Sequence, residues 1–114
     1  MNTPTLVYDD ECGICTRTAR FLDRHGDLEI VGFSGLTGHL RSRLPAEFEQ
    51  CSHFVTAEAV YSCGEAMERA YERTGMPASR LFPLFRRVPG YGVARERVYR
   101  LIATNRPLIG RLLP

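Results

Sequence analysis

Short apolar runs separated by polar punctuation predict a β-α-β unit in the first third of the chain. Thr5–Tyr8 and Leu28–Phe33 are rich in β-branched and aromatic residues, as buried strands are. Between them, apolar positions from Ile14 to Leu22 recur at helical spacing, and Gly26 is placed to end that helix. Two strands joined through a helix are expected to be parallel, with a right-handed crossover.

The middle of the chain predicts a hairpin followed by a helix. His53–Thr56 and Ala59–Ser62 are the expected strands, with a tight turn between them. A helix should follow and end at Gly75. Its apolar face is expected to consist of Ala66, Met67, Ala70 and Tyr71.

The remaining stretches are less regular. Between Ser34 and Ser52 we expect a loop, with a short helix that begins at Pro45. After Met76, prolines divide the chain into short helical pieces, of which the longest runs from Val93 to Arg106. Periodicity predicts an inward face of Ala94, Val98, Leu101 and Ile102 and an outward face of Arg95, Arg97, Arg100 and Arg106.

With 114 residues, of which 44% are hydrophobic and 25% charged, the chain is expected to form one domain with its own core. The first residues, MNTPTLVYDD, lack the basic and apolar regions of a signal peptide. No apolar run reaches the roughly 20 residues of a membrane span. We therefore expect a cytoplasmic protein, in which four cysteines favour metal binding or redox chemistry over a disulfide framework.

Charge is distributed unevenly along the chain. All fifteen basic residues are Arg: residues 1–79 hold seven of them against twelve acids, whereas residues 80–114 hold eight against Glu96 alone. One interpretation is a surface for nucleic acid or an anionic membrane. The other is an arginine face that complements the acidic body of the same domain. The apolar residues interleaved with these arginines favour the second.

The strongest chemical motif is YDDECGIC, residues 8–15, in which two cysteines lie between a predicted strand and a predicted helix. Cys12 would lie at the helix N-terminus, where N–H groups and the helix dipole stabilise a thiolate. Cys15 would lie one turn further on and be more shielded. We therefore assign Cys12 as the attacking thiol and Cys15 as the resolving thiol of a redox-active disulfide. A CxxC within a β-α-β unit also indicates a thioredoxin-like fold.

Two other interpretations of the motif stay open, a zinc site and a pair of inert core cysteines. Zinc would normally need a second knuckle, but Cys51 and Cys63 stand twelve positions apart, and His25, His39 and His53 are scattered. We expect no metal and no bound cofactor. Cys51 and Cys63 are expected to be core or incidental thiols, although Cys63, at a helix start, would be reactive if exposed.

The chain resembles the DCC family of predicted thiol-disulfide oxidoreductases, which is named for an Asp and two Cys in a Tyr-Asp-x-x-Cys-x-x-Cys segment. The resemblance rests on YDDECGIC, on FL in the following helix, and on the late RVPG and VYRLIATNR, so it spans Tyr8 to Arg106. It implies a relative of the thioredoxin fold and assigns the family's motif to Asp9, Cys12 and Cys15.

The expected fold is therefore α/β, with a thioredoxin-like β-α-β…β-β-α core over about residues 4–75 and a C-terminal helical extension over about residues 76–114. One thioredoxin feature is missing. Those folds usually place a cis-proline just before the third strand, and here Gln50-Cys51-Ser52 stands there. Substrate docking is expected to differ accordingly.

Asp9 has two expected roles, which are compatible. Its carboxylate could accept the proton that Cys15 releases during exchange. It could also cap the turn or the helix through backbone N–H groups. Asp10 and Glu11 are expected to be solvated loop charges.

Two functions are consistent with these residues. The first is an enzyme, a thiol-disulfide oxidoreductase of the protein-disulfide reductase type, which acts on protein or small-molecule disulfides through Cys12 and Cys15. The second is a binding module for an acidic partner, RNA or an anionic membrane, with the CxxC as a redox sensor. Its docking residues would be Arg86, Arg87, Arg95, Arg97 and Arg100. We favour the enzyme and expect no nucleic-acid partner.

Overall fold

The computed structural model describes residues 3–105, in which four strands form one sheet in the order β2-β1-β3-β4. The strands are β1 (Thr5–Tyr8), β2 (Glu29–Gly32), β3 (His53–Val55) and β4 (Val60–Ser62). β1 and β2 are parallel, whereas β3 runs antiparallel to both β1 and β4. The predicted β-α-β unit and hairpin are confirmed, and the fold is α/β and thioredoxin-like.

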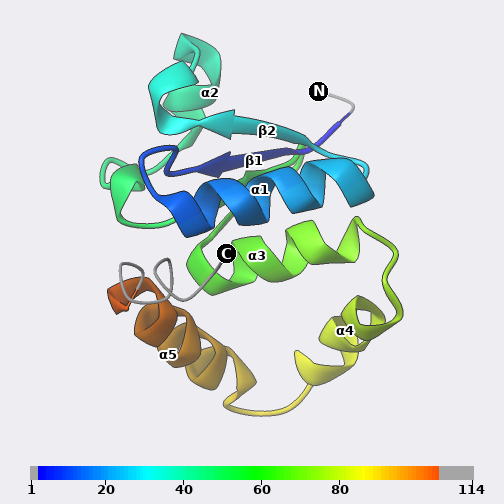
Figure 1. Cartoon of the computed structure of the whole chain (residues 1–114). Coiled ribbons are helices and arrows are strands. Elements are labelled where there is room, and N and C mark those ends of the chain that lie inside the picture. Colours follow the sequence, from blue (N-terminus) through cyan, green and yellow to red (C-terminus); the bar gives the residue numbers. More distant parts are fainter. Residues whose placement is uncertain (1–2, 106–114) are drawn as a thin grey trace.

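Helices cover both faces of the sheet (Figure 1). α1 (Gly13–His25) connects β1 to β2, and α3 (Cys63–Glu72) follows β4 on the same face. α2 (Gly38–Arg43) lies on the opposite face. The predicted end of α1 is confirmed, because the Gly26 N–H caps it by donating to the carbonyl of its last turn at 2.7 Å.

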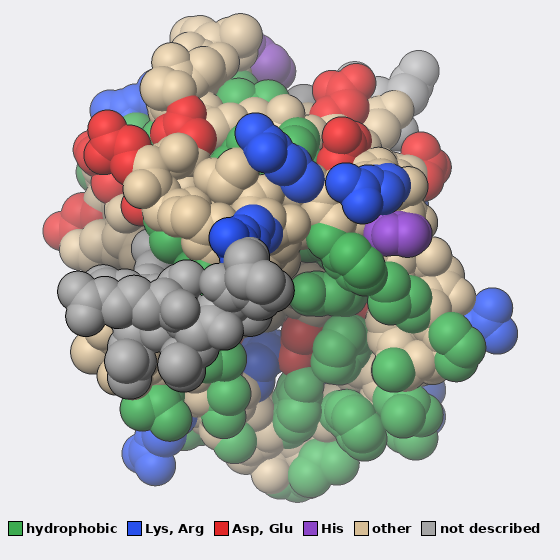
Figure 2. Space-filling view, in the orientation of Figure 1, with side chains coloured by type: hydrophobic (Ala, Val, Ile, Leu, Met, Phe, Trp, Pro, Cys, Tyr) green, Lys and Arg blue, Asp and Glu red, His purple; other side chains and the backbone are tan. Residues whose placement is uncertain are grey.

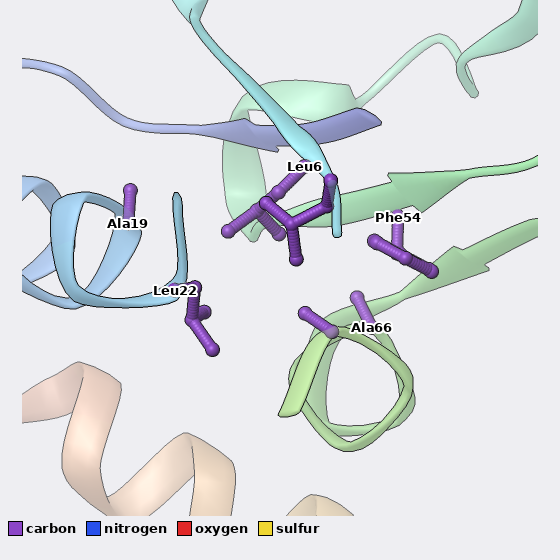
Figure 3. Packing of buried hydrophobic residues seen from close by; sticks show 7 residues of the cluster. Leu6, Ala19, Leu22, Phe54 and Ala66 are labelled. Carbon is purple, nitrogen blue, oxygen red and sulfur yellow. The ribbon is translucent and has the colours of Figure 1, made fainter. Parts of the chain in front are cut away.

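The main core lies between the sheet and the two helices α1 and α3. Side chains alternate along a strand, so Leu6 of β1 and Phe54 of β3, which are paired in the sheet, point to the same face. There they pack with Ala19 and Leu22 of α1 and Ala66 of α3 (Figure 3). The predicted apolar face of α3 is confirmed, because Ala66 and Ala70 are buried there and Met67 and Tyr71 pack against the same core.

The stretch between β2 and β3 differs from the prediction. α2 forms where a loop was expected, since Thr37 caps it by accepting the Leu40 N–H at 3.3 Å. Pro45 begins no α-helix. Apart from α2, this stretch contains two 3-10 turns, η1 (Phe33–Gly35) and η2 (Phe48–Gln50).

Three helical pieces follow α3, namely η3 (Pro77–Leu81), α4 (Phe82–Phe85) and α5 (Tyr91–Thr104). α5 packs against the outer side of α3, away from the sheet (Figure 1). It coincides closely with the predicted helix, although Arg106 lies outside the described residues.

The predicted orientation of α5 is wrong. Ala94, Val98, Leu101 and Ile102 were expected to face inward, but all four are exposed. Arg95 was expected to face outward, but its side chain is only 17% exposed. Arg97 and Arg100 are exposed as predicted. The physical reason is that α5 packs on an acidic surface of α3, as described below.

Apolar side chains also gather at the surface of η3 and α4. Leu81, Leu84 and Phe85 are exposed there, and hydrophobic side chains form a green area at the lower right of Figure 2. Within residues 3–105, no helix combines the length and the apolar character that crossing a membrane requires.

Candidate functional site

The CxxC loop turns from β1 into α1 and places Cys12 at the N-cap of that helix. The Cys15 N–H donates to the Cys12 Sγ at 3.4 Å, and the Thr16 N–H donates to the Cys12 carbonyl at 3.0 Å. The sulfur of Cys12 therefore occupies the position that a Ser or Asp oxygen takes in other helix caps. A negative charge on this sulfur would be stabilised by the N-terminus of the helix.

Cys12 and Cys15 are both thiols and both half-buried. Exposure alone therefore does not distinguish the attacking thiol from the resolving thiol. The two cysteines differ in position, since Cys12 is the N-cap of α1 and Cys15 lines a cavity.

Asp9 closes the turn that leads into the CxxC. Its Oδ1 accepts the Glu11 N–H at 3.0 Å, and its carbonyl accepts the Cys12 N–H at 3.2 Å. Asp9 therefore contacts the Cys12 backbone and caps the turn, which was one of its two expected roles.

Asp10, expected to be a solvated loop charge, is instead held in place. Its carboxylate accepts a short hydrogen bond from the Ser34 hydroxyl. The same carboxylate lies against Gly32, at a position where any side chain on residue 32 would clash with it. Asp10 therefore fastens the CxxC loop to the segment after β2, whereas Glu11 is exposed as predicted.

A cavity of about 260 Å³ opens beside Cys15. β1, α1, α3 and α5 all contribute to its walls, and the lining residues include Ile14, Met67, Tyr71 and Tyr99. Burial raises the pKa of the Tyr71 phenol. Cys15 therefore borders a largely apolar space.

Cys51 and Cys63 form a disulfide, with their Cα atoms 5.1 Å apart, so the prediction of two core or incidental thiols is wrong. The predicted hairpin could have indicated this pairing. Its register places His53 opposite Ser62, and the Cys63 N–H then donates to the Ser52 carbonyl at 2.9 Å. A hairpin therefore brings the residues just outside its open end close together.

His53 organises the backbone on both sides of this disulfide. It is 1% exposed, and its Nε2 lies 2.7 Å from the Phe48 carbonyl and its Nδ1 2.8 Å from the Ser62 Oγ. A carbonyl only accepts hydrogen bonds, so Nε2 carries the proton and Nδ1 accepts from the hydroxyl. Burial lowers the pKa of His53, although its hydrogen bond to the Phe48 carbonyl works against that shift.

Two backbone amides next to the disulfide cysteines hold α5. The Ser52 N–H donates to the Tyr99 hydroxyl at 3.3 Å, and the Gly64 N–H donates to the Glu96 Oε1 at 2.9 Å. A Cβ on residue 64 would lie 2.8 Å from the Glu96 carboxylate, so a larger residue there would displace that side chain. Nothing in the local sequence signalled these contacts, which join segments more than 30 residues apart.

A buried carboxylate on the outer side of α3 attaches the C-terminal helices. Glu68, 5% exposed, accepts hydrogen bonds from Arg86 at 3.1 Å and Arg95 at 3.3 Å, and a short one from the Tyr91 hydroxyl. Arg86 also pairs with Glu72. Burial opposes the charge on Arg86, but Glu72 and Glu68 outweigh it and raise the pKa of that guanidinium.

These ion pairs bear on the expected binding surface for an acidic partner, RNA or membrane. Arg86 and Arg95 are engaged with acids of the same chain, so they complement the acidic body of the protein as the second interpretation of the charge pattern predicted. Arg87, Arg97 and Arg100 are exposed. The arrangement does not favour the binding-module interpretation.

The zinc interpretation finds no support in the side-chain arrangement. Among residues 3–105, no three His, Cys, Asp or Glu side chains come close enough to hold a metal ion. Cys51 and Cys63 are bonded to each other and supply no second knuckle. That the protein works without a metal or cofactor stays a prediction.

Comparison with known proteins agrees with the geometry of the loop. Residues 6–112 match the family model of the DCC1-like thiol-disulfide oxidoreductases. No curated protein and no solved structure matches the chain. The family match covers nearly the whole chain, confirms the suspected DCC family and indicates, at that general level, an oxidoreductase of thiols and disulfides.

Proposed function

The chain belongs to the DCC1-like thiol-disulfide oxidoreductase family, and we propose that it acts through Cys12 and Cys15 as a reductase of protein or small-molecule disulfides in the cytoplasm. The observation that carries the proposal is the position of the Cys12 sulfur. It accepts the Cys15 N–H at 3.4 Å at the start of a helix of 13 residues. The N–H groups at a helix N-terminus stabilise a thiolate, which is the nucleophile in disulfide exchange.

The reaction proceeds in two exchanges. The Cys12 thiolate attacks one sulfur of the substrate disulfide, and the other sulfur leaves as a thiolate that takes up a proton. Cys15 then loses its proton and attacks the Cys12 Sγ, which releases the second substrate thiol. The substrate gains two electrons and two protons, and the enzyme is left with a Cys12–Cys15 disulfide.

Asp9 supports this reaction in one of two ways. The contacts to the Glu11 and Cys12 N–H groups support a positioning role, in which Asp9 sets the turn that presents Cys12. The second role, acceptor of the Cys15 proton, is compatible with the first, because a carboxylate has two oxygens.

The roles of the two cysteines are tested by trapping. In Cys15→Ser the mixed disulfide on Cys12 cannot be resolved, so a disulfide substrate should accumulate as a covalent adduct. Cys12→Ser should trap nothing. Limited iodoacetamide labelling of the reduced protein, mapped by peptide mass, should modify Cys12 first. Equal trapping by both variants would contradict the assignment.

The two roles of Asp9 are separated by a pair of substitutions. Asp9→Asn keeps an oxygen for the turn but cannot take up a proton, whereas Asp9→Ala loses both functions. If Asp9 is the base, Asp9→Asn should slow disulfide exchange by about 10²-fold or more while the protein stays folded. If it only caps, Asp9→Asn should react at the native rate, and Asp9→Ala should lower the melting temperature.

A further inference from the structure

The disulfide Cys51–Cys63 lies at the same edge of the sheet as the CxxC. β1 runs toward the CxxC and β3 runs antiparallel to it, with Val7 paired to His53. Beyond this pair, β1 leads through Tyr8 and Asp9 into the CxxC, and Cys51 lies two residues before His53. Cys63 joins the same edge, because its N–H donates to the Ser52 carbonyl. In Figure 1 the starts of α1 and α3 accordingly lie at the same end of the molecule.

Cys15 and the disulfide Cys51–Cys63 also share neighbours on α5. Cys15 and Ser52 line the cavity of about 260 Å³ beside the CxxC. Cys51 and Cys63 line a second cavity, of about 410 Å³. Tyr99 and Ala103 of α5 line both cavities, so Cys15 of the CxxC and the disulfide Cys51–Cys63 approach one short stretch of α5.

The surroundings of the Cys51–Cys63 disulfide favour thiol–disulfide exchange. Cys63 begins α3, a helix of ten residues, so a thiolate that leaves from Cys63 would lie at a helix N-terminus. Its backbone φ is 59°, in the left-handed region that a non-glycine residue seldom adopts. Cys51, by contrast, is 7% exposed and lies just before β3, the strand that pairs with β1.

We propose that Cys51–Cys63 is a second redox-active pair, which exchanges two electrons with the Cys12–Cys15 pair within one molecule. The inference rests on the proposed function of the CxxC. It also gives the disulfide a role in a reducing compartment, where the disulfides that occur are usually transient and catalytic or redox-sensing.

The exchange balances without any further reactant. The Cys12 thiolate attacks the Cys51 Sγ, the Cys51–Cys63 bond breaks, and Cys63 leaves as a thiolate that takes up the proton given up by Cys12. Cys15 then attacks the Cys12 Sγ, and Cys51 leaves and takes up the proton of Cys15. The CxxC ends as a disulfide and Cys51 and Cys63 as thiols. The same steps in reverse reduce the Cys12–Cys15 disulfide and oxidise Cys51 and Cys63.

The first test is a cross-link. The variant Cys15→Ser/Cys63→Ser keeps only Cys12 and Cys51. On mild oxidation with diamide, the monomer should form the Cys12–Cys51 bond, detected by peptide mass under non-reducing conditions. The control Cys12→Ser/Cys63→Ser keeps Cys15 and Cys51 and should cross-link far less. A folded, monomeric variant without the Cys12–Cys51 bond would overturn the proposal, because disulfides form only when Cα atoms approach to about 7 Å or less.

The second test follows electrons through the native pairs. Fully oxidised protein receives one equivalent of dithiothreitol, is quenched with N-ethylmaleimide at intervals and is mapped by peptide mass. Reduction of Cys51–Cys63 should be about tenfold slower or more in Cys12→Ser, because an internal thiol outcompetes a dilute external one. Equal rates, with the CxxC of the native protein reacting normally, would overturn this inference and leave the proposed function intact. A CxxC that fails to react would overturn the proposed function as well.

Discussion

Glu68 is the residue whose loss should destabilise the protein most selectively, because it joins three side chains of the C-terminal helices to α3. We consider Glu68→Gln, which keeps the shape and one acceptor oxygen but removes the negative charge. The guanidiniums of Arg86 and Arg95 would then lose the negative charge with which both are paired.

The structure sets the size of the effect. Glu68 is 5% exposed, and removal of one partner from a buried ion pair typically costs about 3–5 kcal/mol. Here the two guanidiniums are each 17% exposed, and they keep Glu72 and Glu96 as partners. We therefore expect a loss of about 2–4 kcal/mol in the free energy of unfolding. At about 4 °C per kcal/mol for a domain of this size, the melting temperature should fall by about 8–16 °C.

The matched control is Glu65→Gln on the same helix. Glu65 pairs with Arg69 four residues on, and both side chains are about one-third exposed. Such a pair contributes about 0.5 kcal/mol or less, so the control should lower the melting temperature by no more than about 2 °C, although it removes the same charge. Thermal unfolding followed by circular dichroism and urea unfolding, both at pH 7 without reductant, measure the difference. Equal losses in the two variants would refute the role given to the Glu68 cluster.

Three further predictions concern pH and the attachment of α5. Because the pKa of His53 is lowered in the folded protein, the unfolded chain binds a proton at a higher pH, about 6.5, than the folded protein does. The urea concentration at the midpoint of unfolding should therefore be lower at pH 5.5 than at pH 7.5, and the difference should be smaller in His53→Gln. Burial and the hydrogen bond to Glu68 raise the pKa of Tyr91 to about 12. The contribution of Tyr91 to the free energy of unfolding should therefore be complete below about pH 10 and be lost between about pH 10 and 12. In a titration followed by absorbance at 295 nm, the late ionisation of the Tyr91 phenol should be missing in Tyr91→Phe. Tyr99→Phe removes the acceptor for the buried Ser52 N–H, so the free energy of unfolding should fall by about 1–2 kcal/mol. Hydrogen exchange at the Ser52 amide should become faster, and an unchanged rate would exclude this hydrogen bond.

Much of the fold follows from short-range pattern. The strands β1 and β2, the hairpin and the helices α1 and α3 coincide with predicted segments, because alternation, helical spacing and glycine punctuation act over a few neighbouring residues. The place of Cys12 at the start of α1 follows for the same reason, since the motif directly joins a strand pattern to a helix pattern. That the whole chain forms one domain stays a prediction.

The contacts of Asp10 and the pairing of Cys51 with Cys63 depended on segments that approach in space. Asp10 meets Ser34 because β1 and β2 are parallel neighbours, which sets the ends of both strands side by side. A disulfide requires its Cα atoms to approach to a few ångströms. The hairpin register and the η2 turn before β3 together bring Cys51 and Cys63 to 5.1 Å.

The orientation of α5 was decided by tertiary structure alone. Its sequence defines an apolar stripe and an arginine stripe, and periodicity predicts burial of the apolar one. The side of α3 that α5 covers, however, carries Glu68 and the N–H of Gly64, and these groups are stabilised by the Arg95 guanidinium and the Glu96 carboxylate of α5. Arg95, Glu96 and Tyr99 therefore face inward, and Val98 and Leu101 face outward. A helix sequence determines which residues share a face, whereas the chemistry of the neighbouring surface determines which face is buried.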